Sequence, residues 1–277
     1  GSLLLMPGSI RDPQVYGAKL ISLHGKNPAK GLPAIQGFVS LFDHQTGAPI
    51  AFIEGVTITA IRTAAASAMA TRLLARQDAK THGVFGAGVQ AKSHIQAMHC
   101  VRPAIEETLV WARDRDKADQ FAKTVSDELK VNVRAAKSVQ EVAGADIVTT
   151  VTASPTPILQ GKWLADGAHI NLVGGHTPNE READTDTITR SHIFVETLDA
   201  AFTEAGDLII PQNEGVFSSS DVAGEIGAVA LGHIKGRICD DEMTLYKSLG
   251  NVSQDLYAAW VAYTNAQKHG LGTKVSF

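Results

Sequence analysis

Hydrophobic and polar residues alternate with a period of two at the start of the chain, as they do in strands with one buried face. In the segment 17–23, Lys19 falls in phase with Ile21, so on a strand its ammonium group shares an apolar face. Two more strands are predicted at 34–42 and 48–53, separated by a turn of hairpin length. These segments predict an antiparallel sheet.

After Gln77 the pattern changes to strands that alternate with helices. Most of these strands are apolar on both faces, as expected for a parallel sheet covered by helices. Helices are predicted at 89–99 and 115–130, the second with Asp114 as its N-cap. Strands joined by helical crossovers favour a doubly wound α/β sheet. The predicted strands are 82–85, 108–112, 131–135, 146–152, 169–173 and 192–196.

An alanine-rich helix is predicted from Arg62 to Arg76, with Thr57 or Thr59 as its cap. An arginine in the first turn of a helix opposes the macrodipole, and an anion facing both the arginine and the free N–H groups would offset that conflict. The alternative is an exposed arginine that tolerates a small penalty. A further amphipathic helix is predicted at 251–268.

The composition excludes several classes of protein. With 277 residues, 44% hydrophobic and 19% charged, the chain suits one large or two modest soluble domains. A net charge of -4 without a basic tract argues against nucleic-acid and membrane partners. Cys100 and Cys239 are the only cysteines, which suits a reducing cytoplasm. Residues 1–7 do not have the pattern of a signal peptide. They have the pattern of a strand that begins before residue 1, so we expect residues to precede them.

A glycine turn, Gly86-x-Gly88-x-x-Ala91, lies between a predicted strand and a predicted helix. Glycines at these positions let the backbone approach a pyrophosphate, and the helix N-terminus adds partial positive charge. The turn therefore indicates a dinucleotide cofactor, although glycine pairs also serve ordinary turns.

The end of the second strand of this region bears on the choice of cofactor. If Ala112 takes the position where NAD sites carry an acidic residue, no carboxylate repels a 2′-phosphate, and Arg113 can pair with it. This interpretation predicts NADPH, with NADH possible. In the competing interpretation Asp114 bonds the ribose and Arg113 is solvated.

Two residues are candidates for the chemistry itself. Lys19 lies on an apolar strand face, where an unpaired ammonium is costly, although lysines also extend past apolar neighbours to solvent. His176 follows a strand, at the edge where ligands bind in doubly wound sheets, and can exchange protons near neutral pH. It is equally compatible with a solvated loop residue. The histidines form no metal-binding pattern and no nucleophile elbow is present.

Together these motifs resemble the ornithine cyclodeaminase and mu-crystallin family. The resemblance extends over essentially the whole chain in the right order, and the combination of YGxK, RTAA and KSxG is specific. The matching stretches are LLLMP, YGAKLIS, GLPAIQGFVSLFDHQTGAPIA, TAIRTAAASAMATRLLA, GVFGAGVQA, ADIVTTVTASPTPIL, EAGDLIIP and DEMTLYKSLGNVSQDL.

The resemblance implies a homodimer in which each subunit has a Rossmann domain (77–250) and an α+β substrate-binding and dimerisation domain built from both chain ends (1–76 and 251–277). Lys19 and Arg62 match the family's substrate-carboxylate residues. Cofactor contacts are implied for Thr63, Gly86, Gly88, Val89, Gln90, Thr152, Ser154, Ser248 and Leu249.

Two departures from the family pattern affect the expected activity. Relatives usually carry a longer N-terminal segment with a further substrate-binding arginine, which this sequence lacks. Cyclodeaminases and alanine dehydrogenases of the family have Asp where this chain has His176. Because that Asp is thought to act on the amine during deamination, its replacement argues against ornithine cyclodeaminase.

We therefore expect NADPH-dependent reduction of a small cyclic imino acid, Δ1-pyrroline-2-carboxylate or Δ1-piperideine-2-carboxylate, with Lys19, Arg62 and His176 as the catalytic candidates. Two alternatives remain open. One is an amino-acid dehydrogenase or cyclodeaminase of the same family. The other is a noncatalytic NADPH-binding protein of the crystallin type.

Overall fold

The computed structural model describes residues 1–27 and 30–275 and divides the chain into two units. Unit 1 consists of Gly1–Arg62 together with the chain from Gly250 onward, and unit 2 is Thr63–Leu249. The division falls inside helix α1 (Gly55–Leu74), whereas the sequence analysis expected it near residue 76. The second half of α1 belongs with unit 2 because its apolar side chains pack into the core of that unit.

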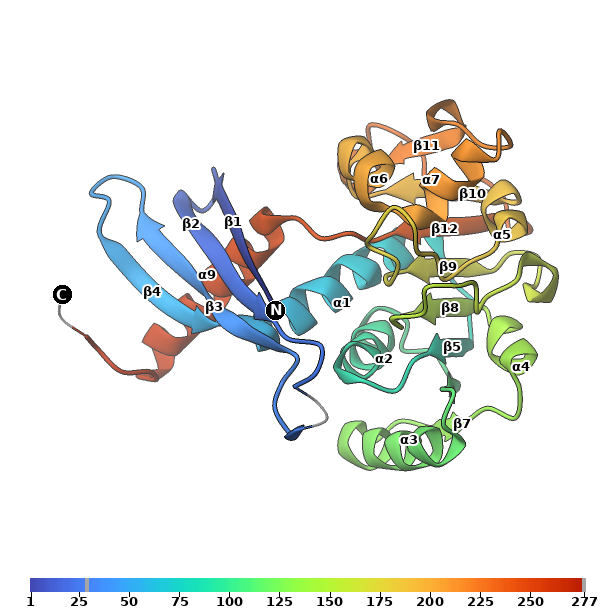
Figure 1. The fold of residues 1–277 in the computed structure, drawn as a ribbon, viewed down its shortest axis with the longest axis horizontal. Helices are drawn as coiled ribbons and strands as arrows, with labels where there is room; N and C mark the ends of the chain where they lie inside the picture. Colours follow the sequence, from blue (N-terminus) through green and yellow to red (C-terminus); the bar gives the residue numbers. More distant parts are fainter. Residues whose placement is uncertain (28–29, 276–277) are drawn as a thin grey trace. The chain divides into compact units, whose positions relative to one another are not determined.

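Unit 1 contains the expected antiparallel sheet, in the order β1-β2-β3-β4 (Figure 1). The carboxylate of Asp43 accepts hydrogen bonds from the N–H groups of Gln45 and Thr46, at 3.0 and 2.8 Å, and so fixes the turn between the last two strands. The strands are β1 (Ser2–Ile10), β2 (Val15–Leu23), β3 (Ile35–Asp43) and β4 (Pro49–Glu54).

Helix α9 (Val252–His269) covers one face of this sheet (Figure 1). Asn251 caps its N-terminus by accepting from Ser253 N, and Gly270 ends it in the left-handed conformation. Leu256 and Ala259 of the helix join Val15, Val39 and Leu41 of the sheet in one buried cluster. Because side chains alternate along a strand, the face that contains Val15 also contains Lys19.

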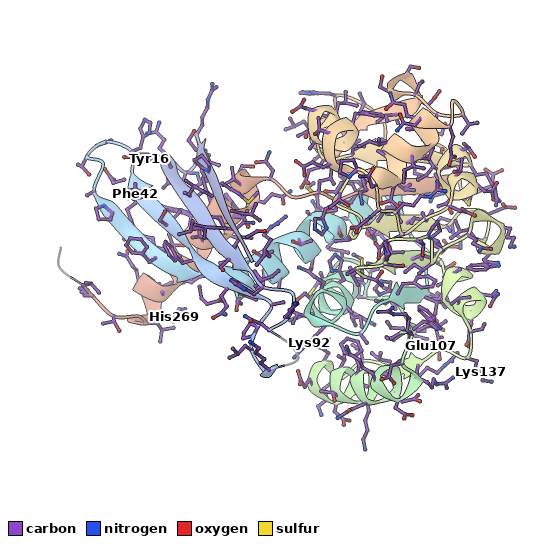
Figure 2. All side chains as sticks on the ribbon, in the orientation of Figure 1. Tyr16, Phe42, Lys92, Glu107, Lys137 and His269 are labelled. Atoms are coloured by element: carbon purple, nitrogen blue, oxygen red, sulfur yellow. The ribbon has the colours of Figure 1, made fainter. Side chains whose placement is uncertain are left out.

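The other face of the sheet is apolar and open to solvent. The rings of Tyr16 and Phe42 stack there with their centroids 5.5 Å apart (Figure 2), and those of Phe38 and Phe52 meet edge to face. Leu5 is 65% exposed and Phe52 54%. Exposed apolar side chains on one sheet face make that face a candidate interaction site.

Unit 2 is built on an eight-stranded parallel sheet in the order β11-β10-β12-β9-β8-β5-β6-β7. This confirms the doubly wound α/β fold. The strands are β5 (Thr81–Phe85), β6 (Glu107–Trp111), β7 (Val133–Ala135), β8 (Ile147–Thr150), β9 (His169–Leu172), β10 (Ser191–Val195), β11 (Val222–Glu225) and β12 (Met243–Lys247).

The six strands predicted from sequence are present, and β11 and β12 are two that the sequence analysis missed. β11 is half-exposed and contains Gly224, so it lacks an apolar run. β12 is fully buried but ends in Lys247, a charge that obscures its hydrophobic pattern. Its insertion between β9 and β10 is a long-range pairing that no local pattern encodes.

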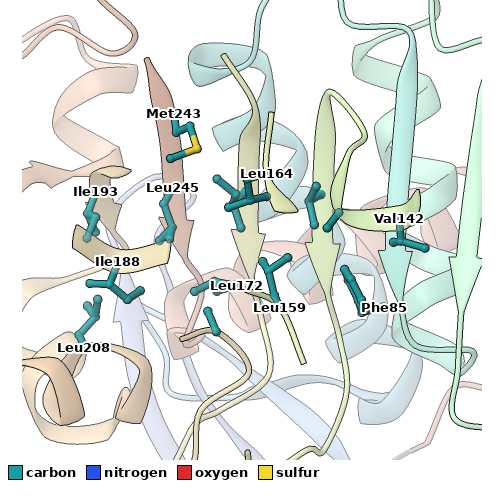
Figure 3. Packing of buried hydrophobic residues seen from close by; sticks show 14 of the residues in the cluster. Phe85, Val142, Leu159, Leu164, Leu172, Ile188, Ile193, Leu208, Met243 and Leu245 are labelled. Carbon is teal, nitrogen blue, oxygen red and sulfur yellow. The ribbon is translucent and has the colours of Figure 1, made fainter. Parts of the chain in front are cut away.

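Helices cover both faces of the sheet in unit 2, as a doubly wound fold requires. On one face, Phe85, Leu172 and Leu245 of the strands pack against Val142 and Leu208 of α4 and α7 (Figure 3). The opposite face packs against α1, α2, α3 and α8. The helices are α2 (Val89–Val101), α3 (Arg115–Leu129), α4 (Val139–Ala143), α5 (Thr185–Thr189), α6 (Leu198–Glu204), α7 (Gly206–Asn213) and α8 (Ile226–Ala230).

The prediction that Arg62 lies in the first turn of its helix is wrong. Helix α1 begins at Gly55, so Arg62 lies about two turns inside it. The carboxylate of Glu54 accepts from Val56 N and Thr57 N, at 2.7 and 2.8 Å, and takes the capping role expected of a threonine. Arg62 is therefore not positioned by a conflict with the helix dipole.

Within 1–27 and 30–275, no helix is both long and apolar enough to traverse a bilayer.

Candidate functional site

The Lys19 ammonium is buried in unit 1, with 2% of its side chain exposed. Its Nζ lies 2.8 Å from Oδ2 of Asp255, a carboxylate of α9 that is completely buried. The sequence placed Lys19 on an apolar strand face, and the structure shows that it is not solvated but paired. The ion pair offsets part of the cost of burying the ammonium.

Arg62 binds the same carboxylate from α1. Its Nε donates to Oδ1 of Asp255 at 3.1 Å, and its Nη1 donates to Oε1 of Gln254 at 3.1 Å. Gly250 makes room for the guanidinium, since a Cβ there would lie 2.3 Å from Nη1. Lys19 and Arg62, which are far apart in the sequence, are thus brought together by one carboxylate. We call Lys19, Arg62 and Asp255 the cationic cluster.

The charges of this cluster act on one another. Burial, and then the neighbouring charge of Arg62, lower the pKa of Lys19 below its ordinary value of 10.5, while Asp255 acts in the opposite direction. The cluster contains two cations and one carboxylate, so it has one net positive charge in a place that water barely reaches. Such an excess favours binding of an anion.

The glycine turn of unit 2 connects β5 to α2 and has the geometry of a phosphate cradle. Gly86 has φ of +131°, and a Cβ there would lie 3.0 Å from the carbonyl oxygen of Val151. A Cβ on Gly88 would meet nothing within 4 Å, and no described side chain caps the helix that starts at Val89. The first N–H groups of α2 are therefore open to an anion.

Two buried polar atoms near strand ends also fit a bound dinucleotide. Within the described part of the chain, the Ser248 hydroxyl and the Gln90 amide oxygen have no hydrogen-bond partner. Ser248 follows β12, and Gln90 lies in the first turn of α2. Buried polar groups without partners are rare, and a ligand that supplies the missing bonds accounts for them. The residues present thus fit a nicotinamide dinucleotide.

The strand end that bears on cofactor choice also has a defined geometry. Asp114 Oδ1 accepts from Lys117 N at 3.1 Å and caps α3, so its carboxylate is already engaged. Arg115 pairs with Asp119. Arg113 is exposed and forms no ion pair among the described residues.

A second buried cluster lies in unit 2 at the carboxyl ends of β8, β9 and β12. Lys247 Nζ lies 2.9 Å from Asp207 Oδ2 and also donates to the carbonyl oxygen of Gly174. Asp207 Oδ1 accepts from the N–H groups of Glu182 and Ala183, at 2.9 and 3.0 Å. We call Lys247, Asp207 and Glu182 the anionic cluster.

Glu182 connects two loops that follow neighbouring strands. Its Oε1 accepts from N and Oγ1 of Thr152, at 2.7 and 2.5 Å. Its Oε2 accepts from Thr150 Oγ1 at 2.6 Å and Gly174 N at 2.8 Å. Burial raises the pKa of Glu182 above its ordinary value, against the effect of the threonine hydrogen bonds and Lys247. The loops after β8 and β9 are therefore held by one buried carboxylate.

The remaining predicted residues lie at the carboxyl edge of this sheet or on α1. Thr152 and Ser154 follow β8, and Ser154 Oγ donates to Thr156 O. His176 follows β9 and is exposed. The N–H of Leu249, after β12, donates to Glu196 at 3.0 Å. Ala112 follows β6, and Thr63 is buried on α1.

The sequence analysis missed the acidic members of both clusters. Asp255 had a usable signal, since it stands four residues before Ala259 on the buried face of α9. Asp207 and Lys247 lie inside the matching stretches EAGDLIIP and DEMTLYKSLGNVSQDL. Neither stretch indicates which residue its charged side chain contacts. No group of three or more acidic, histidine or cysteine side chains among the described residues is arranged to bind a metal ion.

The sequence matches the model of the ornithine cyclodeaminase/mu-crystallin family over residues 1–270. It is 37% identical over 276 residues to a Delta(1)-pyrroline-2-carboxylate reductase of Bacillus cereus, covering 99% of this chain and 84% of the relative. It is also 37% identical over 264 residues to the ketimine reductase mu-crystallin of Mus musculus, covering 95% and 80%.

Solved structures show the same fold. The Delta(1)-pyrroline-2-carboxylate reductase of Thermococcus litoralis, in complex with NADH and L-proline, matches with a TM-score of 0.95 at 38% identity, covering 99% of this chain and 84% of the other. An archaeal alanine dehydrogenase dimer with bound NAD matches with a TM-score of 0.92 at 29% identity and the same coverage. The predicted family resemblance is confirmed.

Proposed function

Because the chain belongs to the ornithine cyclodeaminase/mu-crystallin family, we propose that it reduces a small cyclic imino acid with NADPH as the preferred cofactor. At a coarser level it is an NAD(P)H-dependent oxidoreductase that acts on C–N bonds. The observation that carries the proposal is the cationic cluster, whose excess positive charge suits the carboxylate of Δ1-pyrroline-2-carboxylate or Δ1-piperideine-2-carboxylate.

In the proposed mechanism, Arg62 and Lys19 bind the substrate carboxylate and so orient the adjacent C=N carbon. The nicotinamide cofactor supplies the hydride when it is bound. Protonation of the imine nitrogen makes the carbon electrophilic. The carbon then gains the hydride, and the electrons of the C=N π bond become the lone pair of the amine. Lys19, whose pKa is lowered, and His176 are the two candidates for holding that proton.

The preference for NADPH is supported by the end of β6. A carboxylate that binds the ribose hydroxyls repels a 2′-phosphate, but Asp114 is engaged in capping α3. Arg113, exposed and outside any described ion pair, is available to a phosphate. The fit of the glycine turn to a dinucleotide is independent of this preference.

Reduction is favoured over cyclodeamination by His176. The structure puts this residue in the loop after β9, where the resemblance gives cyclodeaminases an aspartate. An imidazole in solvent differs from a carboxylate both in charge and in proton affinity, so it does not replace that group. We expect no ammonia release from ornithine, lysine or alanine.

A homodimer is supported by the exposed apolar face of the sheet in unit 1, which includes Leu3, Leu5 and Phe52. The archaeal alanine dehydrogenase of the same fold is a dimer. Leu5→Asp should place a charge in the interface and shift the protein to monomers in light scattering. Leu231→Asp, at an equally exposed apolar residue of unit 2, is the control.

The decisive experiment is oxidation of NADPH, beside NADH, with Δ1-pyrroline-2-carboxylate and Δ1-piperideine-2-carboxylate. Turnover with higher kcat/KM for NADPH supports both the reaction and the cofactor choice. Turnover that favours NADH keeps the reaction and removes the argument from Arg113. NADPH binding without turnover of either imine overturns the proposal and favours the oxidative or noncatalytic alternatives.

A further inference from the structure

Two neighbouring residues of α9 hold both cations of the candidate substrate site. Asp255 contacts Lys19 with one carboxylate oxygen and Arg62 with the other, at 2.8 and 3.1 Å. Gln254 accepts from the Arg62 guanidinium at 3.1 Å, and Gly250 leaves the space that it fills. The orientation of each cation is therefore set by the start of one helix.

A purely structural ion pair does not account for this arrangement. One cation would neutralise Asp255, and a second buried cation adds a desolvation cost without a second carboxylate to offset it. The two cations also repel each other, and the charge of Arg62 lowers the pKa of Lys19. Apolar residues would fill the same volume without this cost. An excess of buried positive charge is useful where an anion completes the cluster.

The geometry points to Asp255, assisted by Gln254, as a positioning residue for substrate: it holds Lys19 and Arg62 together so that both can contact one carboxylate. This inference rests on the proposed function, because it concerns the same carboxylate site. It assigns the role to a residue that does not itself touch substrate.

Asp255 also favours the protonated form of Lys19 before a ligand binds, because its negative charge raises the pKa of the ammonium. The charged groups that face the ammonium are Arg62, which favours the neutral amine, and Asp255, which favours the ammonium. Val39 lies opposite Lys19 on β3 and belongs to the apolar cluster that Leu256 of α9 also joins. Removing the carboxylate lowers the pKa of Lys19 further, because burial and Arg62 both favour the neutral amine. In such a variant an incoming anion should raise that pKa and so draw protons onto Lys19 as it binds.

The test uses pyrrole-2-carboxylate, a planar monocarboxylate that cannot be reduced as an imine. Its binding to the protein with NADP⁺ or NAD⁺ is measured by calorimetry at neutral pH, in buffers of different ionisation enthalpy. Asp255→Asn should bind roughly tenfold or more weakly than wild type and take up more protons on binding than wild type does. Pyrrole-2-carboxamide, which lacks the charge, should bind neither protein measurably.

Further variants keep the test informative if Asp255→Asn does not fold. Gln254→Leu should weaken binding several-fold without additional proton uptake, and Asp255→Glu should retain wild-type proton behaviour. Asp116→Asn, at an exposed carboxylate in the first turn of α3, is the matched control and should bind as wild type.

The outcomes separate this inference from the proposed function. Wild-type affinity and proton stoichiometry in Asp255→Asn, or wild-type affinity in Gln254→Leu if Asp255→Asn does not fold, overturn the positioning role even if imines are reduced. Weaker binding by Asp255→Asn, with greater proton uptake than wild type, supports it even if no imine is reduced. If pyrrole-2-carboxylate does not bind the wild-type protein at all, both the proposed carboxylate site and the positioning role of Asp255 are overturned.

Discussion

Each unit of the protein buries a cluster of three ionisable side chains, and the two clusters have opposite charge excess. The cationic cluster of unit 1 contains two cations and one carboxylate. The anionic cluster of unit 2 contains two carboxylates and one ammonium. The difference lies in how the excess charge is satisfied. Backbone N–H groups and hydroxyls can solvate a carboxylate, and they do so around Glu182 and Asp207.

Carbonyl oxygens can likewise solvate a cation, as those of Thr71, Arg72 and Ala75 do for the buried Arg102. In the cationic cluster, by contrast, Lys19 and Arg62 share the carboxylate of Asp255. We propose that this cluster binds a ligand, whereas the anionic cluster connects loops. Burial is similar in both places, so burial alone does not distinguish a ligand site from an internal brace. The hydrogen-bond acceptors and donors around each cluster distinguish the two.

The comparison is tested most strongly by Arg62→Ala. This change leaves Lys19 and Asp255 as a neutral pair, so the fold should persist while the attraction for a carboxylate disappears. We expect kcat/KM for the imine to fall by about 10² to 10⁴, or about 3–5 kcal/mol of transition-state stabilisation. Steady-state kinetics measure the loss. Arg72→Ala, at an exposed arginine of the same helix, should change little, and a near-normal Arg62 variant would remove it from the mechanism.

Lys247→Met should have its main effect on stability. It leaves two buried carboxylates without their cation, which costs about 3–5 kcal/mol of unfolding free energy. Chemical denaturation measures the change. Lys80→Met breaks the exposed pair with Glu106 and should change the free energy of unfolding little. Equal effects of the two substitutions would contradict the view of the anionic cluster as a brace.

Arg113→Ala extends the comparison to a cation in solvent. Loss of a charge-assisted contact with a 2′-phosphate should raise KM for NADPH roughly tenfold and leave KM for NADH unchanged. The ratio of kcat/KM for the two cofactors reports the effect. Arg115→Ala, which removes an arginine already paired with Asp119, should leave that ratio intact. An equal change in KM for both cofactors would mean that Arg113 does not bind the 2′-phosphate.

Acid should destabilise unit 2 through its buried histidines. Burial lowers the pKa of His82 to about 3, of His94 to about 4 and of His169 to about 3. The unfolded chain binds protons near the ordinary pKa of 6.5, so the stability these residues contribute is complete above that pH and is lost as the pH falls. Each costs about 1 kcal/mol between pH 7 and pH 5.5.

Thermal unfolding across this pH range measures the slope, which His82→Asn should reduce by about one third if the three histidines contribute alike. The exposed His44 of unit 1 provides the control, since His44→Asn should leave the slope unchanged. A slope that is the same in both variants and the wild type would assign the acid sensitivity to other groups.

Local patterns in the sequence predicted most of the fold. Apolar runs located six strands of unit 2, and alternation located those of unit 1 and put Lys19 on the buried face. The pattern failed where a structure depends on distant partners. β12 enters the sheet between strands that precede it in the chain, and its buried lysine interrupts the apolar signal.

The candidate site divides in the same way. The glycine turn and Lys19 could be recognised because each needs a particular residue in a particular local setting. The position of Arg62 was misjudged because the cap of α1 is Glu54, a residue that also ends a strand. Asp255 could not be linked to Lys19 from the sequence, since their contact joins segments at opposite ends of the chain.

The backbone conformation of Gly250 bears on which mutations the carboxylate site tolerates. Its φ of +93° strains any residue with a Cβ, and such a Cβ would displace the Arg62 guanidinium, which lies 2.3 Å away. Every amino acid that a single-base change can substitute for glycine carries a Cβ. Each of these substitutions should therefore disturb the carboxylate site, although glycine has no side chain and performs no chemistry.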